Sequence, residues 1–148
     1  MNETKEVEDF ILILENLKNG LSEIVFEVVD KNDKKLTDLV RSQLSTGTEG
    51  TGKPIKPPYT PFTVKIKKAK AQEHRFVTLR DTGDFWASID VEFDRSNESI
   101  QVIATDPKTN KLILKYGPNI LEVSPENLRV FLKMVFTDIE QQFKKALL

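Results

Sequence analysis

The chain of 148 residues contains no cysteine, one histidine and one tryptophan. Without thiols it has no disulfide bonds, no thiolate catalysis and no cysteine-based zinc site, which fits folding in a reducing cytoplasm. No apolar run approaches the roughly 20 residues of a membrane span. The run Phe10 to Leu14 is also too short for the core of a signal peptide. We therefore expect no membrane association.

The chain also has almost no net charge. Its 22 Lys and Arg residues balance its 23 Asp and Glu residues, which leaves a formal net charge of −1. Such a balance argues against a protein whose affinity comes from bulk attraction to nucleic acid. The charge is uneven, however: Lys53–Arg80 is basic and Asp81–Asp94 is acidic. The remaining composition, 39% hydrophobic and 30% charged, is that of one globular domain able to bury a core.

The stretch Phe76–Phe93 organises the predicted fold. It begins with an apolar–polar alternation that is typical of a strand and breaks at Asp81-Thr82-Gly83-Asp84, where Gly83 tolerates a positive φ. The aromatic pair Phe85-Trp86 follows, and a second alternation then places Ile89, Val91 and Phe93 on one face. This pattern predicts a folding centre rather than an active site.

The N-terminal part reads as helical. Apolar residues recur at helical spacing between Val7 and Leu17, and Gly20 is expected to stop this helix. A second apolar stripe begins near Leu21 and extends to Leu44. The charged segment Asp30–Lys35 is either an exposed turn of one helix or a break, and continuity is favoured because the stripe keeps its phase across it.

Ser45–Pro61 is rich in glycine and proline and predicts a long loop, which in a compact domain is more often functional or ordered by a partner than idle. Lys65, Lys67 and Lys68 follow on a strand or a short helix and would form an exposed basic edge. Arg95–Glu98 reads as a hairpin turn into a strand at Ser99–Thr105.

A third short apolar segment, Leu112–Tyr116, ends at Gly117-Pro118. Ser124 is a good helix N-cap, with Pro125 at the first helical position. The prediction is an α+β fold in one domain, 1–148. N-terminal helices (1–44) and a C-terminal helix (124–148) pack on a small antiparallel sheet of about three to four strands within 62–117, with a long Gly/Pro-rich loop at 45–61.

Three patterns in the sequence could carry chemistry. Gly47–Lys53 has the spacing of a phosphate-binding loop, but Pro54 stands where a magnesium-binding hydroxyl is needed and a helix precedes the loop instead of a strand. The lone His74 lies in a polar stretch, where one imidazole is most often simply exposed. The acids of 81–94 lie on a turn and on the wet face of a strand, where carboxylates are ordinarily solvated. We therefore predict no catalytic, cofactor-binding or metal site, and no enzyme.

The ordered set of motifs resembles a known group. It comprises Asp38–Leu44, the glycine-rich Gly47–Ile55, Pro58–Pro61, the stretch Thr78–Phe85 with Ser88-Ile89, and Lys115-Tyr116-Gly117. Over residues 36–130 the chain resembles small structural proteins of tailed bacteriophages and prophages, and more distantly the tail-completion and virion-morphogenesis proteins of the neck. In that group a leucine, a Thr-Gly pair and a Ser-Ile pair mark a helix-to-sheet junction, which here corresponds to Leu79, Thr82-Gly83 and Ser88-Ile89.

The resemblance implies a structural role in the virion, assembled in the bacterial host cytoplasm. Such proteins form rings or parts of a neck or tail, so the expected partners are other copies of this chain and portal, neck or tail subunits. The expected interface residues are Thr48, Lys53, Ile55, Tyr59, Lys65, Lys67, Lys68 and Lys70. The expected core and fold-motif residues are Leu79, Thr82, Gly83, Phe85, Trp86, Ile89, Tyr116, Gly117 and Leu132. The alternative is a small nucleic-acid-binding or regulatory protein that uses the basic segment Lys53–Arg80.

Overall fold

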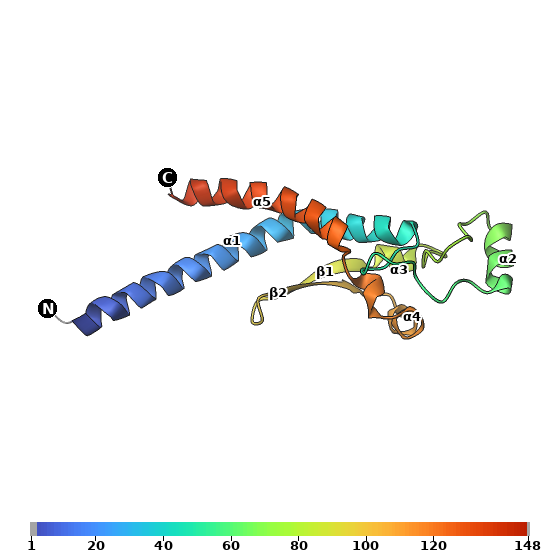
Figure 1. Cartoon of the computed structure of the whole chain (residues 1–148), viewed down its shortest axis with the longest axis horizontal. Helices are drawn as coiled ribbons and strands as arrows, with labels where there is room; N and C mark the ends of the chain where they lie inside the picture. Colours follow the sequence, from blue (N-terminus) through green and yellow to red (C-terminus); the bar gives the residue numbers. More distant parts are fainter. Residues whose placement is uncertain (1–2, 148) are drawn as a thin grey trace. The chain divides into compact units, whose positions relative to one another are not determined.

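The computed structural model describes residues 3–147 and confirms an α+β fold. In chain order the elements are α1 (Glu3–Ser45), α2 (Pro61–Ala69), α3 (Asp84–Ala87), β1 (Ile89–Asp94), β2 (Ser99–Ala104), α4 (Thr109–Tyr116), a 3-10 turn η1 (Pro118–Leu121) and α5 (Pro125–Leu147) (Figure 1). Contacts within the chain divide it into two units. The first holds 1–32 with 133–148, and the second holds 33–132.

Helix α1 is a single helix, so the predicted stop at Gly20 is wrong. A glycine inside a helix costs only about 1 kcal/mol relative to alanine, and the helix-forming residues on both sides outweigh it. The favoured continuity across Asp30–Lys35 is confirmed. Within this segment Asn32 is buried, and its Nδ2 donates to Val28 O at 2.7 Å and to Asp138 Oδ2 at 3.1 Å. This side chain links the α1 and α5 parts of the first unit.

Burial changes sharply along α1 in the first unit. Phe26, Val28 and Val29 are buried, whereas every side chain that the structure describes between Lys5 and Leu21 is exposed. Among residues 3–147 no helix combines the length and the apolar character that crossing a bilayer requires.

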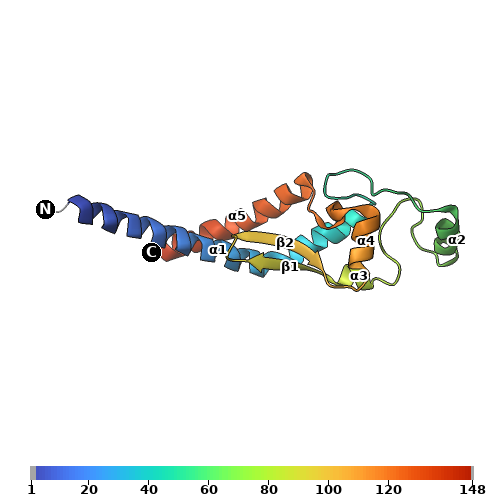
Figure 2. The same cartoon turned by 90° about the horizontal axis from the view of Figure 1, so that it is seen from below.

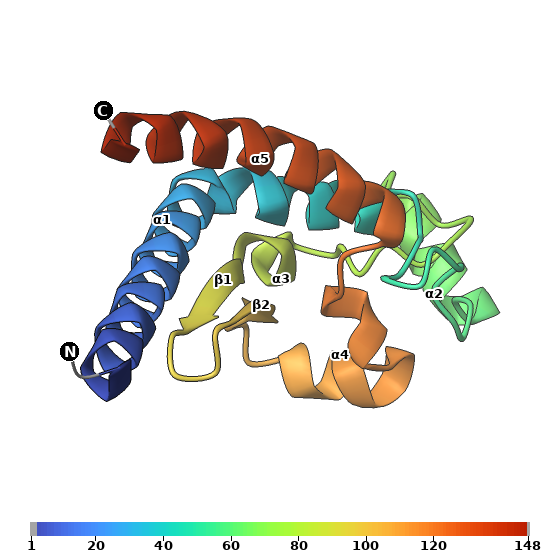
Figure 3. The same cartoon turned by 60° about the vertical axis from the view of Figure 1, so that its left-hand side comes forward.

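The sheet of the second unit is one antiparallel hairpin, in which β1 pairs with β2 from Ile89↔Ala104 to Asp94↔Ser99 (Figure 2). The predicted hairpin turn at Arg95–Glu98 lies where expected. The described residues contain two strands, not three to four. Figure 3 shows the short helix α3 at the start of β1 and helix α4 after β2.

The segment Phe76–Arg80, predicted as a strand, has no regular secondary structure and pairs with no described strand. Its backbone groups bond to side chains instead. Thr78 N donates to the Tyr59 hydroxyl at 3.1 Å, and Thr78 O accepts from Trp86 Nε1 at 2.9 Å. Arg80 O accepts from Lys67 Nζ at 2.7 Å. Because side chains satisfy these groups, the segment needs no partner strand.

Leu112–Tyr116, expected in the sheet region, belongs to helix α4. A short apolar run does not distinguish strand from helix by its periodicity. Here the helical spacing directs Leu112 and Tyr116 to the protein while Leu114 is 88% exposed. The lysine-rich segment after Phe62 is likewise helical and forms α2, capped by Thr60, whose Oγ1 accepts from Thr63 N at 3.2 Å.

The core of the second unit contains most of the residues expected there. Leu79, Phe85, Ile89 and Tyr116 are buried, and the half-buried Trp86 packs against them. Leu132 is 42% exposed, so its assignment to the core is wrong. Two glycines of the expected motif adopt a positive φ at the end of a helix. Gly83 (φ 95°) caps the start of α3, and Gly117 (φ 90°) follows the last residue of α4.

Gln43 of α1 fixes the start of α5. Its Nε2 donates to Glu122 O at 2.9 Å, and its Oε1 accepts from Ser124 N at 2.9 Å. The predicted N-cap is confirmed, because Ser124 Oγ accepts from Asn127 N at 3.3 Å.

Candidate functional site

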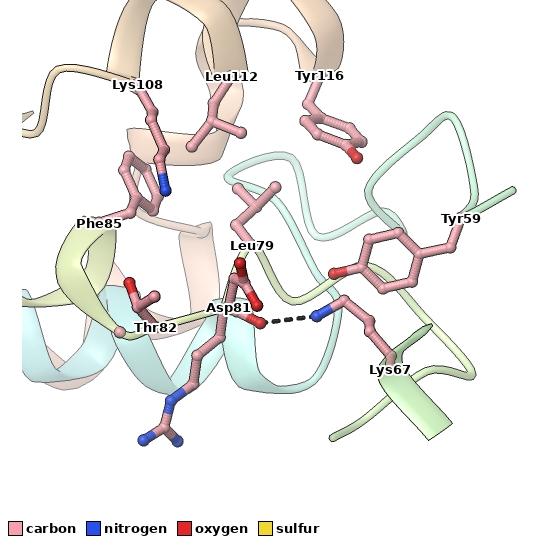
Figure 4. A pocket seen from close by; sticks show the side chains of 11 residues that line it. Tyr59, Lys67, Leu79, Asp81, Thr82, Phe85, Lys108, Leu112 and Tyr116 are labelled. Carbon is pink, nitrogen blue, oxygen red and sulfur yellow. Dashed lines mark hydrogen bonds between the residues drawn. The ribbon is translucent and has the colours of Figure 1, made fainter. Parts of the chain in front are cut away.

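A cavity of about 160 Å³ lies between α2, the segment 79–83 and α4. Figure 4 shows its lining, with Lys67 and Tyr59 on one side and Leu112 and Tyr116 on the other. The lining residues are Tyr59, Lys67, Leu79, Arg80, Asp81, Thr82, Gly83, Phe85, Lys108, Leu112 and Tyr116. Of the expected interface residues, only Tyr59 and Lys67 lie here.

The backbone at Leu79 shapes one wall of the cavity. Leu79 adopts φ 57°, a left-handed conformation that is uncommon for a residue with a branched side chain. The conformation is held because the preceding residue, Thr78, is bonded on its N–H by Tyr59 and on its carbonyl by Trp86. The side chain of Leu79 is 8% exposed.

Lys67 is the most unusual residue of the cavity, because it is only 7% exposed. Its Nζ donates to Arg80 O at 2.7 Å and to Gln72 Oε1 at 3.3 Å, and it lies 5.0 Å from the centre of the Tyr59 ring. All three contacts are to uncharged groups. Among the side chains that the structure describes, no carboxylate lies within 4 Å of this ammonium group. Lysine is rarely buried without an anionic partner.

The one carboxylate that lines the cavity is already engaged. Lys70 Nζ donates to Asp81 Oδ1 at 2.9 Å and thereby lowers the pKa of Asp81, and the charge of Lys67 acts in the same direction. Arg80 lies over the Trp86 ring at 5.2 Å. Lys108 adds another cation to the lining. Three cations and one paired acid leave the cavity with an excess of positive charge.

The size and charge of the cavity limit what it can hold. Sites for small-molecule ligands and cofactors usually measure about 300–1,000 Å³, so this cavity is too small for a nucleotide. A single side chain fits this volume. Its apolar walls suit a short aliphatic stem, and Lys67 suits a carboxylate at the end of that stem.

The other expected interface residues are not brought together. Lys53, Lys65 and Lys68 are exposed, and Lys70 is exposed but paired with Asp81. Thr48 is half-buried and forms an isolated bridge with Pro54, whereas Ile55 is 4% exposed and belongs to the core. Ile55 was therefore wrongly placed at an interface: a single apolar residue in a polar loop packs inward when the loop lies against the core.

Two cavity residues, Lys108 and Leu112, are not among the site residues expected from the sequence. Leu112 lies on α4, and Lys108 is the residue that precedes this helix. Sequence spacing does not bring either residue to Tyr59 and Lys67, which they meet only through the fold.

The glycine-rich segment Gly47–Lys53 is a packed turn. Glu49 N donates to Lys53 O, Gly50 N to Asn119 O and Gly52 N to Glu49 O, at 2.8–2.9 Å. A phosphate-binding loop needs its amide groups free to face the phosphate, and these three are already bonded. The geometry therefore agrees with the sequence argument against nucleotide binding.

His74 and the acidic residues do not converge. His74 Nδ1 lies 3.2 Å from Gln72 O, and the carboxylate of Asp94 accepts four hydrogen bonds within its own turn. Asp90 and Glu92 are exposed. In the described part of the chain, no three residues of the metal-binding types gather around one point.

Comparison of the chain with models of protein families, with curated proteins and with solved structures found no match.

Proposed function

We propose that the chain is a structural component of a tailed-phage virion. It acts at the neck, as a head–tail connector or tail-completion protein, through assembly with its own copies and with portal, neck or tail subunits. The observation that carries this proposal is the run Phe10–Leu14 on α1, in which each of five consecutive apolar side chains is 49–60% exposed. A contiguous exposed apolar surface of this kind marks a site of protein–protein contact.

The junction implied by the resemblance to phage proteins supports the proposal. Between the Thr82-Gly83 pair and the Ser88-Ile89 pair, the chain forms the short helix α3 and enters β1. Arg41 of α1 binds this junction, with Nε donating to Trp86 O at 2.8 Å and Nη2 donating to Ile89 O at 2.9 Å. A junction between a short helix and a strand at these residues is compatible with the proposal.

The cavity around Lys67 suits a role in assembly. An acidic side chain from a neighbouring subunit would enter it and supply the missing negative charge. The exposed acids Asp90 and Glu92 on β1 of another copy have the required chemistry. Complementary charge of this kind fixes the register of an interface more than it adds affinity.

The alternative, nucleic-acid binding through Lys53–Arg80, has less support. Lys67 is buried, and Lys70 and Arg75 are paired with Asp81 and Glu73. Binding through the remaining lysines would weaken steeply as salt is raised. Measurement of DNA and RNA affinity at low and high salt distinguishes this alternative from a structural role.

Mass spectrometry of purified particles tests the proposed function. Particles of the phage or prophage that encodes the chain should contain it in several copies, alongside capsid and portal peptides from the same sample. Host cytoplasmic proteins of similar size serve as the control for contamination. A particle that contains capsid and portal peptides but not this chain would overturn the proposal.

A further inference from the structure

The N-terminal part of α1 carries five consecutive apolar residues, Phe10–Leu14, and each is 49–60% exposed. One helical turn contains 3.6 residues, so five in a row cover the full circumference. A helix that is apolar all round is normally buried. Nothing in the described part of the chain covers this one, because every described side chain between Lys5 and Leu21 is exposed.

The same segment follows a seven-residue repeat. The positions spaced alternately by three and four residues are all apolar: Val7, Phe10, Leu14, Leu17, Leu21, Ile24 and Val28. Three positions of each heptad point away from this stripe. Two of them are polar throughout, Glu8, Asp9, Glu15, Asn16, Ser22 and Glu23, and the third holds Leu12, Asn19 and Phe26. The described side chains of the first two heptads are exposed, whereas Val28 at the end of the stripe is buried within the first unit. A heptad pattern on the exposed part of a helix favours a coiled coil.

We propose that the stripe Val7–Leu21 is covered by the same segment of a second copy, parallel and in register. Equivalent apolar residues then meet along the whole seam. The flanking positions that face each other in this arrangement are Ile13 with Lys18 and Gly20 with Val25, so no two like charges are opposed. Ile11 and Ile13 widen the stripe, which leaves room for further copies beside the first pair.

The exposed area is sufficient for such an interface. Six apolar side chains of the stripe and its flanks, each about half exposed, leave roughly 500 Å² per copy, taking about 150–200 Å² for a large side chain. Two copies then bury about 1,000 Å², the size at which specific interfaces begin. The six are Val7, Phe10, Ile11, Ile13, Leu14 and Leu21.

The charges beside the stripe favour a second copy over a lipid surface. Helices that lie on membranes place lysine and arginine on the polar face, where they meet anionic headgroups. Here Glu8, Asp9 and Glu15 occupy that face. Anionic lipid would repel them, whereas in a coiled coil they point to solvent.

Two leucines of the same helix provide a matched test. Leu14 lies on the stripe and is 49% exposed, whereas Leu12 lies on the opposite side and is 56% exposed. The full chain should have a mass that is a multiple of 16.9 kDa at micromolar concentration. Leu14→Glu should weaken self-association roughly tenfold or more, because it places charges in an apolar seam. Leu12→Glu introduces the same charge away from the seam and should leave the mass unchanged.

Cysteine crosslinking tests the register independently of any effect of Glu on folding. The natural chain has no cysteine, so a single introduced thiol reports on one position. Under mild oxidation Leu14→Cys should form a disulfide-linked dimer, since equivalent positions meet in a parallel, in-register pair. Leu12→Cys should remain monomeric in a denaturing gel.

A monomeric wild-type chain would overturn the inference, as would equal effects of the two glutamate variants or equal crosslinking at both positions. Binding of the monomeric chain to anionic lipid vesicles would also overturn it and assign the stripe to a membrane. These measurements use purified protein and do not depend on a role in a virion. Failure here therefore leaves the particle experiment untouched, and the reverse also holds.

Discussion

Two aromatic side chains direct the backbone at Thr78. The Tyr59 hydroxyl accepts from Thr78 N, and Trp86 Nε1 donates to Thr78 O. A hydrogen bond of this kind contributes about 1 kcal/mol net, while leaving a buried partner unpaired costs about 1–3 kcal/mol. These two bonds therefore satisfy both backbone groups of Thr78 without a partner strand.

Removal of the Tyr59 hydroxyl tests this account. Tyr59→Phe should lower the free energy of unfolding by about 1–2 kcal/mol, because Thr78 N–H loses its acceptor in a buried place. Tyr116→Phe is the matched control: it removes a hydroxyl from the same cavity, and the hydroxyl that bonds Thr78 N is that of Tyr59. Its effect should stay within about 0.5 kcal/mol. Urea unfolding followed by circular dichroism measures both, and equal effects would contradict the assignment.

Substitution by alanine should change the stability of the protein in opposite directions at two glycines. At Gly50 an added Cβ would lie 2.3 Å from Glu122 Cβ and 2.9 Å from the Glu122 carbonyl, so Gly50→Ala should destabilise by about 1–3 kcal/mol. At Gly20 an added Cβ meets nothing within 4 Å. Gly20→Ala should therefore stabilise α1 by about 0.5–1 kcal/mol. Thermal unfolding of both variants measures the difference in sign.

At the scale of elements, the hairpin turn depends on one carboxylate. Asp94 accepts from Ser96 N (3.1 Å), Ser96 Oγ (2.6 Å), Asn97 N (3.1 Å) and Asn97 Nδ2 (2.7 Å). The bond from the Ser96 side chain, followed by those from Asn97, lowers the pKa of Asp94 to about 2. The hairpin turn is thus stabilised by the carboxylate of Asp94, which must stay ionised.

The pH dependence follows from the direction of this shift. An unfolded aspartate has a pKa of about 3.9, so the contribution of Asp94 to stability is complete above that pH and is lost as pH falls through about 2. Titration of the Asp94 carboxyl by NMR should show the lowered pKa. Ser96→Ala should raise it toward the ordinary value, because the first of its donors is gone. An unchanged titration in that variant would contradict the assignment.

Helix α2 is attached through Lys67. Lys67→Met keeps the stem but removes the bond to Arg80 O, so amide hydrogen exchange in α2 should become faster while that in β1 and β2 is unchanged. Lys68→Met is the matched control, because the neighbouring Lys68 is exposed. Faster exchange in both variants would mean that the attachment does not depend on Lys67.

The elements that could be predicted from sequence are those whose signal is local. The β1–β2 alternation, the Ser124 cap and the continuity of α1 across Asp30–Lys35 all depend on residues a few positions apart. The segment 76–80 could not be predicted, because its partners are the side chains of Tyr59, Lys67 and Trp86. The prediction of three to four strands is wrong for the same reason. It is also wrong because a short apolar run such as Leu112–Tyr116 does not distinguish a strand from a helix.

At the scale of the whole molecule, the two units differ in how much of their apolar surface the chain itself covers. The second unit contains a buried cluster that includes Val40, Leu44, Val77 and Ile120. In the first unit the described side chains from Lys5 to Leu21 are all exposed. The positions in the cavity could not be predicted from sequence either, because Tyr59, Lys67 and Lys108 meet only through the fold.

A higher protein concentration should therefore protect one part of the chain selectively from amide hydrogen exchange. Amide exchange within residues 5–21 should slow as protein concentration rises, since self-association covers that segment, while exchange in β1 and β2 should stay constant. Mass spectrometry of exchanged peptides at two concentrations measures this. Uniform protection across the chain would point to general aggregation, and no change would point to a monomer.

The sole indole of the chain, on Trp86, lies half-buried between the Thr78 carbonyl and the Arg80 guanidinium. Its emission is therefore an optical signal of the α3–β1 junction alone. Helices α1 and α5 contribute no indole and are followed by ellipticity. Recorded on one sample, the two signals separate loss of the junction from loss of the helices.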